Sequence, residues 1–239
     1  MGTALEITAL VALLGGGADH CDYSLARDLT LPVTAVSLVD IRAGSGDLHV
    51  EGMDGLDEIR VEGRVCASDE ALLEDLTISA ETDGGTAFIQ TNYPDQRDRG
   101  WRGWTASIDL VVLVPTGMAV EIDDSSGNME VRGTGDLRID DSSGSIYVED
   151  ILGSVEVDDS SGGLDIEGVD GDVRVSDGSG GIDVTDVTGD VIIDEDGSGS
   201  IEVRDVGQNF TVRRDGSGGI RHSGVRGTVD IPERRRRGG

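Results

Sequence analysis

One pattern of about 18 residues occurs six times in succession between Val120 and Thr228, and this repetition limits the fold more than any other feature of the chain. Every copy contains a turn in which an aspartate lies three residues before a glycine and a serine lies one residue before it. The turn glycines are Gly127, Gly144, Gly162, Gly180, Gly199 and Gly218, which places successive copies 17 to 19 residues apart. Repeats of this length are typical of solenoid proteins.

Apolar residues alternate with polar ones on both sides of each turn. In the second copy, Leu137 and Ile139 precede the turn, and Ile146 and Val148 follow it. A period of two over short stretches predicts half-buried strands, and two strands leave no room for a helix within one copy. One copy cannot bury its apolar face alone, so equivalent strands must pair from copy to copy. The repeats therefore predict an all-β protein: a single-stranded β-solenoid of six rungs over residues 120–231, with about 18 residues and two short strands per rung.

Composition agrees with a thin solenoid and excludes several classes of function. Glycine is abundant (37 of 239 residues) and aromatic residues make up only 3%, as a core one aliphatic side chain thick requires. All 19 basic residues are arginine, which excludes a Walker-type phosphate loop and a Schiff-base lysine. A net charge of −29 argues against a nucleic-acid partner.

Residues 19–119 are predicted to form a β-rich region with irregular rungs. Residues 39–52 repeat the turn at Ser45 and Gly46, although Ala43 replaces the turn aspartate. Ser68 precedes the segment ALLEDL as a helix cap would, so we expect a short helix there. The segments LTISAET and TAFIQTN, joined by Asp-Gly-Gly, predict a hairpin. A polar loop with three aromatic residues follows.

The repeats, together with the leader turn GSGDLHVEG, resemble the bacterial putative-adhesin family of unknown function, which occurs in cell-envelope proteins and lipoproteins. The resemblance covers roughly residues 35–231. It implies a repeat-built β-solenoid and a place at the cell envelope, and it implies no catalytic residue.

Residues 1–18 contain an apolar run too short to span a bilayer, which we interpret as the core of a signal peptide. A basic segment before this run is missing. A lipoprotein anchor on Cys21 is a weaker interpretation, because Ala18, Asp19 and His20 depart from the usual lipidation motif. If the chain is exported, Cys21 and Cys66 are expected to form a disulfide; the alternative is two small buried thiols.

Two columns of aspartates are the strongest chemical feature of the repeats. Stacked carboxylates one rung apart repel each other by about 1 kcal/mol in bulk water, so something must offset the repulsion. One interpretation is that each turn aspartate accepts hydrogen bonds from the amides of its own turn. The other is a calcium ladder with carboxylate ligands. The candidate ligands are Asp123, Asp124, Asp140, Asp141, Asp158, Asp159, Asp177 and Asp196.

The aromatic loop and the last rung are candidate contact regions. Aromatic and arginine side chains are enriched at binding hot spots, so the loop is a candidate site for a protein or glycan partner; alternatively, it covers the open edge of the first rung. The residues concerned are Tyr93, Trp101, Arg102 and Trp104. Residues 120–209 carry a net charge of −21, whereas residues 210–231 carry +2. We interpret the arginines of the last rung as charges that discourage end-to-end pairing, and residues 232–239 as a disordered basic tail.

The sequence lacks the common catalytic signatures HExxH, GxSxG and GxGxxG. We therefore expect a non-enzymatic, exported, monomeric structural or interaction protein, periplasmic or extracellular, without an integral membrane span. No cofactor is expected, unless the aspartates bind calcium. The alternatives are a carbohydrate-active β-solenoid enzyme, a calcium-binding repeat protein and a cytoplasmic accessory protein.

Overall fold

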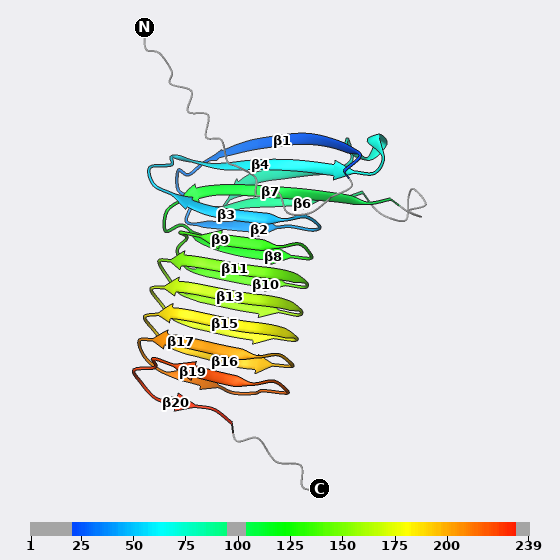
Figure 1. The fold of residues 1–239 in the computed structure, drawn as a ribbon. Helices are drawn as coiled ribbons and strands as arrows, with labels where there is room; N and C mark the ends of the chain where they lie inside the picture. The colour runs from blue at the N-terminus through cyan, green and yellow to red at the C-terminus, as the bar shows by residue number, and fades with distance from the viewer. Residues whose placement is uncertain (1–20, 95–103, 233–239) are drawn as a thin grey trace.

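The computed structural model of the protein describes residues 21–94 and 104–232. Its strands form two ten-stranded sheets that lie face to face as a flattened coil (Figure 1). Sheet A has the order β1 (Tyr23–Pro32), β4 (Glu58–Ala67), β7 (Ala106–Pro115), β3 (Leu48–Met53), β9 (Met129–Arg132), β11 (Gly144–Ile151), β13 (Gly162–Val169), β15 (Gly180–Val187), β17 (Ile201–Val206) and β19 (Ile220–Ser223).

Sheet B faces sheet A across the core. Its order is β20 (Val229–Asp230), β18 (Phe210–Val212), β16 (Val191–Asp196), β14 (Val173–Asp177), β12 (Val155–Asp159), β10 (Leu137–Asp141), β8 (Ala119–Asp124), β2 (Leu38–Arg42), β6 (Thr86–Asn92) and β5 (Thr77–Asp83). Each repeat contributes one strand to each sheet, and equivalent strands of neighbouring repeats pair in parallel. The predicted β-solenoid, with the rung length expected from the repeats, is confirmed.

The leader turn also forms a rung. Strands β2 and β3 pair in parallel with β8 and β9, so residues 38–53 stack directly on the first regular repeat. Ala43 follows Arg42, which pairs with Asp123, and its amide donates to the Asp123 carbonyl at 2.9 Å. The column of turn aspartates therefore begins at Asp124.

The core is a ladder of aliphatic side chains between the two sheets. One column of this ladder in sheet B is at most 2% exposed at every rung, and it runs through Val120, Leu137, Val155, Val173, Val191 and Phe210. Burial of the alternating side chains on the inner faces explains the period of two in the sequence.

The turn glycines are required for two reasons. Gly144 has φ +148°, a conformation that residues with a side chain rarely adopt. In addition, a Cβ at Gly144 would lie 1.7 Å from the carbonyl oxygen of Gly127, and one at Gly162 would lie 1.6 Å from that of Gly144. A side chain at this corner would push neighbouring rungs apart.

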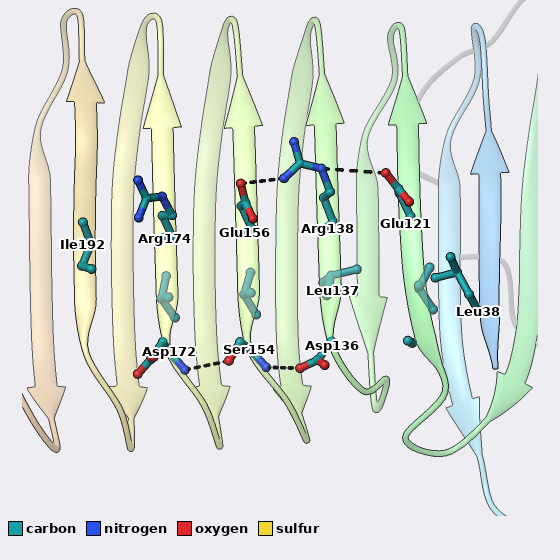
Figure 2. A pocket seen from close by; sticks show the side chains of 14 residues that line it. Leu38, Glu121, Asp136, Leu137, Arg138, Ser154, Glu156, Asp172, Arg174 and Ile192 are labelled. Atoms are coloured by element: carbon teal, nitrogen blue, oxygen red, sulfur yellow. Dashed lines mark hydrogen bonds and ion pairs between the residues drawn. The ribbon is translucent and has the colours of Figure 1, made fainter.

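The opposite corner carries a ladder of side chains that the repeat pattern did not predict. Asp136 Oδ1 accepts a hydrogen bond from the Ser154 amide at 2.9 Å, and Ser154 Oγ accepts one from the Asp172 amide at 3.2 Å. The ladder continues from Asp172 Oδ1 to the Asp190 amide at 2.8 Å, and from Asp190 Oδ1 to the Asn209 amide at 2.8 Å. Each rung thus supplies an acceptor for a backbone amide of the next, and Figure 2 shows the part of the ladder that joins Asp136, Ser154 and Asp172.

The leader is less regular than the repeats. Strands β1, β4 and β7 pair antiparallel in sheet A, and β5 and β6 form the predicted hairpin at the end of sheet B. The expected helix is a single 3-10 turn, η1 (Glu70–Leu72). Its cap is Asp69, which accepts the Ala71 amide at 2.9 Å, whereas Ser68 Oγ accepts the Thr105 amide at 3.0 Å. The assignment of Ser68 as the cap was therefore wrong, because its hydroxyl serves the neighbouring strand connection. The segments predicted as signal peptide (1–18) and basic tail lie outside the described residues, except for Pro232.

Candidate functional site

The turn aspartates form a buried column inside the solenoid. Their side chains are 1 to 3% exposed, and parallel pairing aligns them from rung to rung: Asp124, Asp141, Asp159, Asp177 and Asp196. At three rungs Oδ1 accepts the amide of the serine two residues later, at 3.0 to 3.3 Å, as in Ser161 to Asp159. The expected Asx turn is confirmed at these rungs.

Burial disfavours the charged form of these carboxyl groups. Loss of hydration, followed by the charge of Asp141, raises the pKa of Asp124 to about 7. Burial likewise raises the pKa of Asp159 and of Asp177 to about 6, while turn amides act in the opposite direction. Among the described residues, neither Oδ2 of Asp159 nor Oδ2 of Asp177 has a hydrogen-bond partner. The pKa of every aspartate in the column is therefore raised above the ordinary value, chiefly by burial.

The second aspartate column lies on the other side of the strands. Asp123, Asp140 and Asp158 are exposed on the outer face of sheet B, one residue before the buried aspartates. The structure thus separates the two sets of proposed calcium ligands by the thickness of a strand. Within residues 21–94 and 104–232, no group of three or more His, Cys, Asp or Glu side chains is arranged to hold a metal ion.

The aromatic loop is described only in part. The Tyr93 hydroxyl donates to the Ser45 carbonyl at 2.6 Å and accepts from the Ser45 amide at 3.0 Å, and its ring packs against Gly44. Trp104 is half-buried against the core. Tyr93 thus covers the turn of the leader rung. Trp101 and Arg102, the other proposed contact residues, lie outside the described residues.

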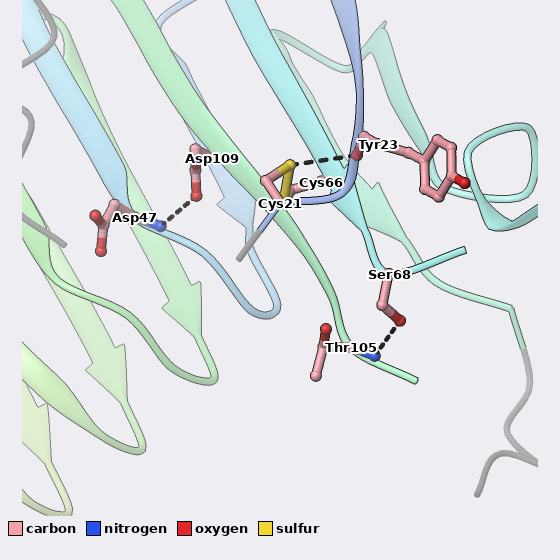
Figure 3. Close-up of a disulfide and its surroundings, with 7 residues drawn as sticks. All are labelled: Cys21, Tyr23, Asp47, Cys66, Ser68, Thr105 and Asp109. Atoms are coloured by element: carbon pink, nitrogen blue, oxygen red, sulfur yellow. Dashed lines mark hydrogen bonds between the residues drawn. A yellow bond between two sulfur atoms is a disulfide. The ribbon is translucent and has the colours of Figure 1, made fainter. Parts of the chain in front are cut away.

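Cys21 and Cys66 form the predicted disulfide, with their Cα atoms 5.4 Å apart (Figure 3). The bond joins residues 45 positions apart and attaches the start of β1 to the end of β4. Nearby, the Asp47 amide donates to Asp109 Oδ1 at 3.1 Å and links the leader rung to β7. The disulfide and this bond stabilise the end of the solenoid where pairing becomes antiparallel.

The outer face of sheet B carries a shallow hollow of about 400 Å³ (Figure 2). Charges of alternating sign line it, because Glu121, Arg138, Glu156 and Arg174 occupy equivalent positions on successive strands. An Arg138 nitrogen lies 2.6 Å from a Glu156 oxygen and another lies 3.8 Å from Glu121. These charges neutralise one another within the sheet.

The outer face of sheet A carries two hollows of about 300 and 330 Å³, one on each side of Tyr147. Tyr147 is 52% exposed. Sequence reasoning missed this residue. The available signal was that Tyr147 is the one aromatic residue at an outward position of the six copies, since the other, Phe210, replaces a core valine.

Two arginines of the last rung form ion pairs with acidic residues of the rung before. Arg213 pairs with Asp194 and Arg214 pairs with Glu195. These contacts neutralise acidic side chains of β16. Strand β20 pairs with β18, so neither arginine lies at the open edge of sheet B, and the role of the last-rung arginines in discouraging end-to-end pairing stays a prediction.

No protein-family model and no curated protein matches the chain. Among solved structures, a putative cell adhesion protein from Clostridium sporogenes is 12% identical, with a TM-score of 0.35, and the match covers 87% of this chain and 99% of that one. A putative adhesin from Bacteroides fragilis is 14% identical with a TM-score of 0.33, covering 88% and 97%. A putative lipid binding protein from Parabacteroides distasonis is 17% identical with a TM-score of 0.39, covering 86% and 96%.

Identities and TM-scores of this size support no conclusion about the function of this chain. In the described part of the chain, no helix is long and apolar enough to cross a membrane. The structural conclusion is that the chain is a β-solenoid, and it follows from the parallel register of its own rungs.

Proposed function

We propose that the protein is an exported, non-enzymatic interaction module of the cell envelope, which presents the outer faces of a rigid β-solenoid to a partner. The observation that carries this proposal is the division of the rungs into two sides. The inner side is a packed aliphatic ladder, and the hollows around Tyr147 and Arg138 open on the outer faces. Side chains held at rung spacing give a preorganised surface, which lowers the entropic penalty of binding.

The Cys21–Cys66 disulfide supports export. Disulfides persist in the periplasm and outside the cell, and the cytoplasm of most organisms keeps thiols reduced. The bond closes a loop between residues 45 positions apart in the leader, which is the less regular part of the fold, and so constrains the unfolded chain there.

The charged side chains of the outer faces support binding rather than catalysis. In the sheet B hollow, Arg138 lies between Glu121 and Glu156, so these carboxylates act as ion-pair partners. Acid–base catalysis needs an acid and a base with different pKa values at one reacting centre. The outer face of sheet B instead repeats the same pattern of ion pairs from strand to strand. The proposed function needs no cofactor, so we expect equal thermal transitions in EDTA and in millimolar calcium.

Saturable binding of the labelled full chain to intact cells of the producing strain tests the proposal. We expect binding that is lost in variants of outward side chains whose melting temperatures match the wild type. Release of new reducing ends from envelope polysaccharide would instead support the carbohydrate-active enzyme. Absence of saturable binding to cells would overturn the interaction role.

A further inference from the structure

Two columns of side chains run along the outer face of sheet A. Parallel pairing places equivalent residues of successive rungs side by side, so each column can be followed from the leader to the last rung. The first column is His49, Glu130, Tyr147, Asp165, Asp183, Glu202 and Arg221. The second is Glu51, Arg132, Glu149, Glu167, Thr185, Arg204 and Ser223.

The two arginines in the middle of this face are each bound in the same way. An Arg132 nitrogen lies 2.6 Å from a Glu130 oxygen on its own strand and 3.1 Å from Glu149 on the next rung. Arg204 pairs with Glu202 on its own strand and lies 2.9 Å from Asp183 on the preceding rung. On this face, a guanidinium group therefore fits between carboxylates of adjacent rungs.

The rung between these two clusters carries carboxylates without an arginine. Asp165 and Glu167 of β13 both point outward, and neither forms an ion pair within the described parts of the chain. Loss of hydration and the charge of Asp183 raise the pKa of Asp165. Tyr147 lies directly beside Asp165 in the register. The carboxylates of β13 and the exposed ring of Tyr147 are therefore neighbours on the outer face of sheet A.

Two glycines open the hollow next to this pair. Gly163 and Gly181 occupy positions that hold Ser145 and Ser200 in the neighbouring rungs. A Cβ at Gly163 would meet only Ser145 Oγ, at 3.9 Å, and one at Gly181 would meet only Ser200 Oγ, also at 3.9 Å. Neither glycine has the positive φ of the turn glycines. The backbone therefore accepts a side chain at both positions, and their lack of one leaves the hollow of about 300 Å³.

We propose that this hollow binds an arginine side chain of an extended basic segment in a partner protein, with the guanidinium group over Tyr147 and paired with Asp165, both of which line it. Glu167, two residues further along β13, lines the adjoining hollow of about 330 Å³ and adds negative charge beside this pair. The inference rests on the proposed function and names the chemistry of the partner. A guanidinium group is planar, stacks on aromatic rings and forms paired hydrogen bonds with carboxylates, so it matches both Tyr147 and Asp165. The net charge of −29 attracts a basic segment at long range.

The test is the fluorescence anisotropy of a labelled peptide with two arginines separated by glycine. Matched peptides contain lysine or neutral citrulline in place of arginine. The protein is the full chain in which Arg234, Arg235, Arg236 and Arg237 are changed to serine, so that its own basic segment cannot compete. We expect the arginine peptide to bind about tenfold more tightly than the lysine peptide and the citrulline peptide not to bind.

Three variants of the site each have a matched control. Tyr147→Ala and the pair Asp165→Asn with Glu167→Gln are expected to weaken arginine binding about tenfold. The control for the charge variant removes two negative charges from the outer face of sheet B, with Asp140→Asn and Asp158→Asn. This control is expected to change the affinity for the arginine peptide less than about twofold. Gly163→Gln fills the hollow and should abolish binding. Its control is Gly219→Gln in the last rung, where a Cβ would meet no atom within 4 Å and binding should be unchanged.

Equal affinities for the arginine and lysine peptides would overturn the inference, since net charge alone would then explain binding. Equal losses in the sheet A and sheet B charge variants would overturn it for the same reason. If the arginine peptide does not bind but the full chain still binds cells saturably, this inference fails and the proposed function stands. If the chain binds neither, both fail.

Discussion

Asp158 and Asp159 are consecutive residues of β12, yet their carboxyl groups lie on opposite faces of sheet B. Asp158 is exposed, whereas Asp159 is 1% exposed inside the solenoid. The same division holds at Asp140 and Asp141 in the rung before. It means that two aspartates with the same intrinsic chemistry contribute to stability in different ways.

The buried column predicts a solenoid that is more stable in mild acid. Burial raises the pKa of Asp159 to about 6, from about 3.9 in an unfolded chain, so the fold favours the protonated acid. Its stabilising contribution is complete below about pH 4 and is lost as the pH rises through about 6. For Asp124 the loss extends to about pH 7. Urea unfolding between pH 4 and pH 8 should show this decline.

Asp159→Asn and Asp158→Asn separate the buried column from general acidity, because each removes one negative charge from the same strand. We expect Asp159→Asn to increase the free energy of unfolding at pH 8 by about 1 kcal/mol and to flatten the pH dependence. Asp158→Asn should change it by less than about 0.5 kcal/mol. Equal effects of the two substitutions would contradict the assignment.

Gly162 and Gly163 are a second pair of neighbours with opposite roles. A Cβ at Gly162 would lie 1.6 Å from the Gly144 carbonyl oxygen, and its φ is +154°, whereas a Cβ at Gly163 meets nothing closer than 3.9 Å. Gly162→Ala should therefore destabilise the protein by roughly 3 kcal/mol or more, and Gly163→Ala should be neutral or slightly stabilising. Thermal melting of both variants is the measurement. A tolerated alanine at Gly162 would be incompatible with the close approach of the turns.

The corner ladder predicts a stabilising role for Asp172. Its Oδ1 accepts the Asp190 amide at 2.8 Å, so Asp172→Ala leaves that amide without its acceptor and should cost about 1 to 2 kcal/mol. Asp172→Asn keeps a carbonyl oxygen at the same position and should recover most of the loss. Chemical denaturation of the two variants distinguishes the hydrogen bond from a charge effect. Equal destabilisation in alanine and asparagine would argue against the ladder.

The disulfide is expected to stabilise the leader more than the repeats. Cys66→Ser should reduce the stability of β1, β4 and β7 by about 3 to 4 kcal/mol in the chain-entropy model, because the closed loop is long. In a solenoid each rung contacts only its neighbours, so distant rungs such as β16 and β17 should keep their stability. Hydrogen exchange resolved by strand is the measurement. Uniform acceleration of exchange through all rungs would contradict this local role.

The repeating residues made most of the fold predictable. Leu137, Ile139, Ile146 and Val148 show the period of two that sets the inner faces, and Gly144 marks the corner where rungs approach each other. The leader was less predictable because its strands pair antiparallel over long sequence separations, as β1 does with β4. The cap of the 3-10 turn was misassigned for a similar reason: Ser68 bonds to Thr105, which is distant in sequence.

The candidate site was harder to predict than the fold. The aspartate columns were visible in the sequence. The sequence did not show that Asp124 points into the core and Asp123 points outward. Tyr147 belongs to no column of identical residues, and its importance depends on the glycines of the neighbouring rungs. Repeat comparison finds what rungs share, whereas a binding site on a repeat protein consists of the positions where they differ.

We propose that this solenoid functions outside the cytoplasm with Cys21 and Cys66 oxidised. Thiol trapping in cells that produce the full chain tests it most directly: acid quenching, alkylation with a mass-shifting maleimide, and detection before and after reduction. We expect Cys21 and Cys66 to resist alkylation until the chain is reduced, and the chain to be recovered from the envelope or the medium. Two freely alkylated thiols on a chain recovered from the cytoplasm would contradict it.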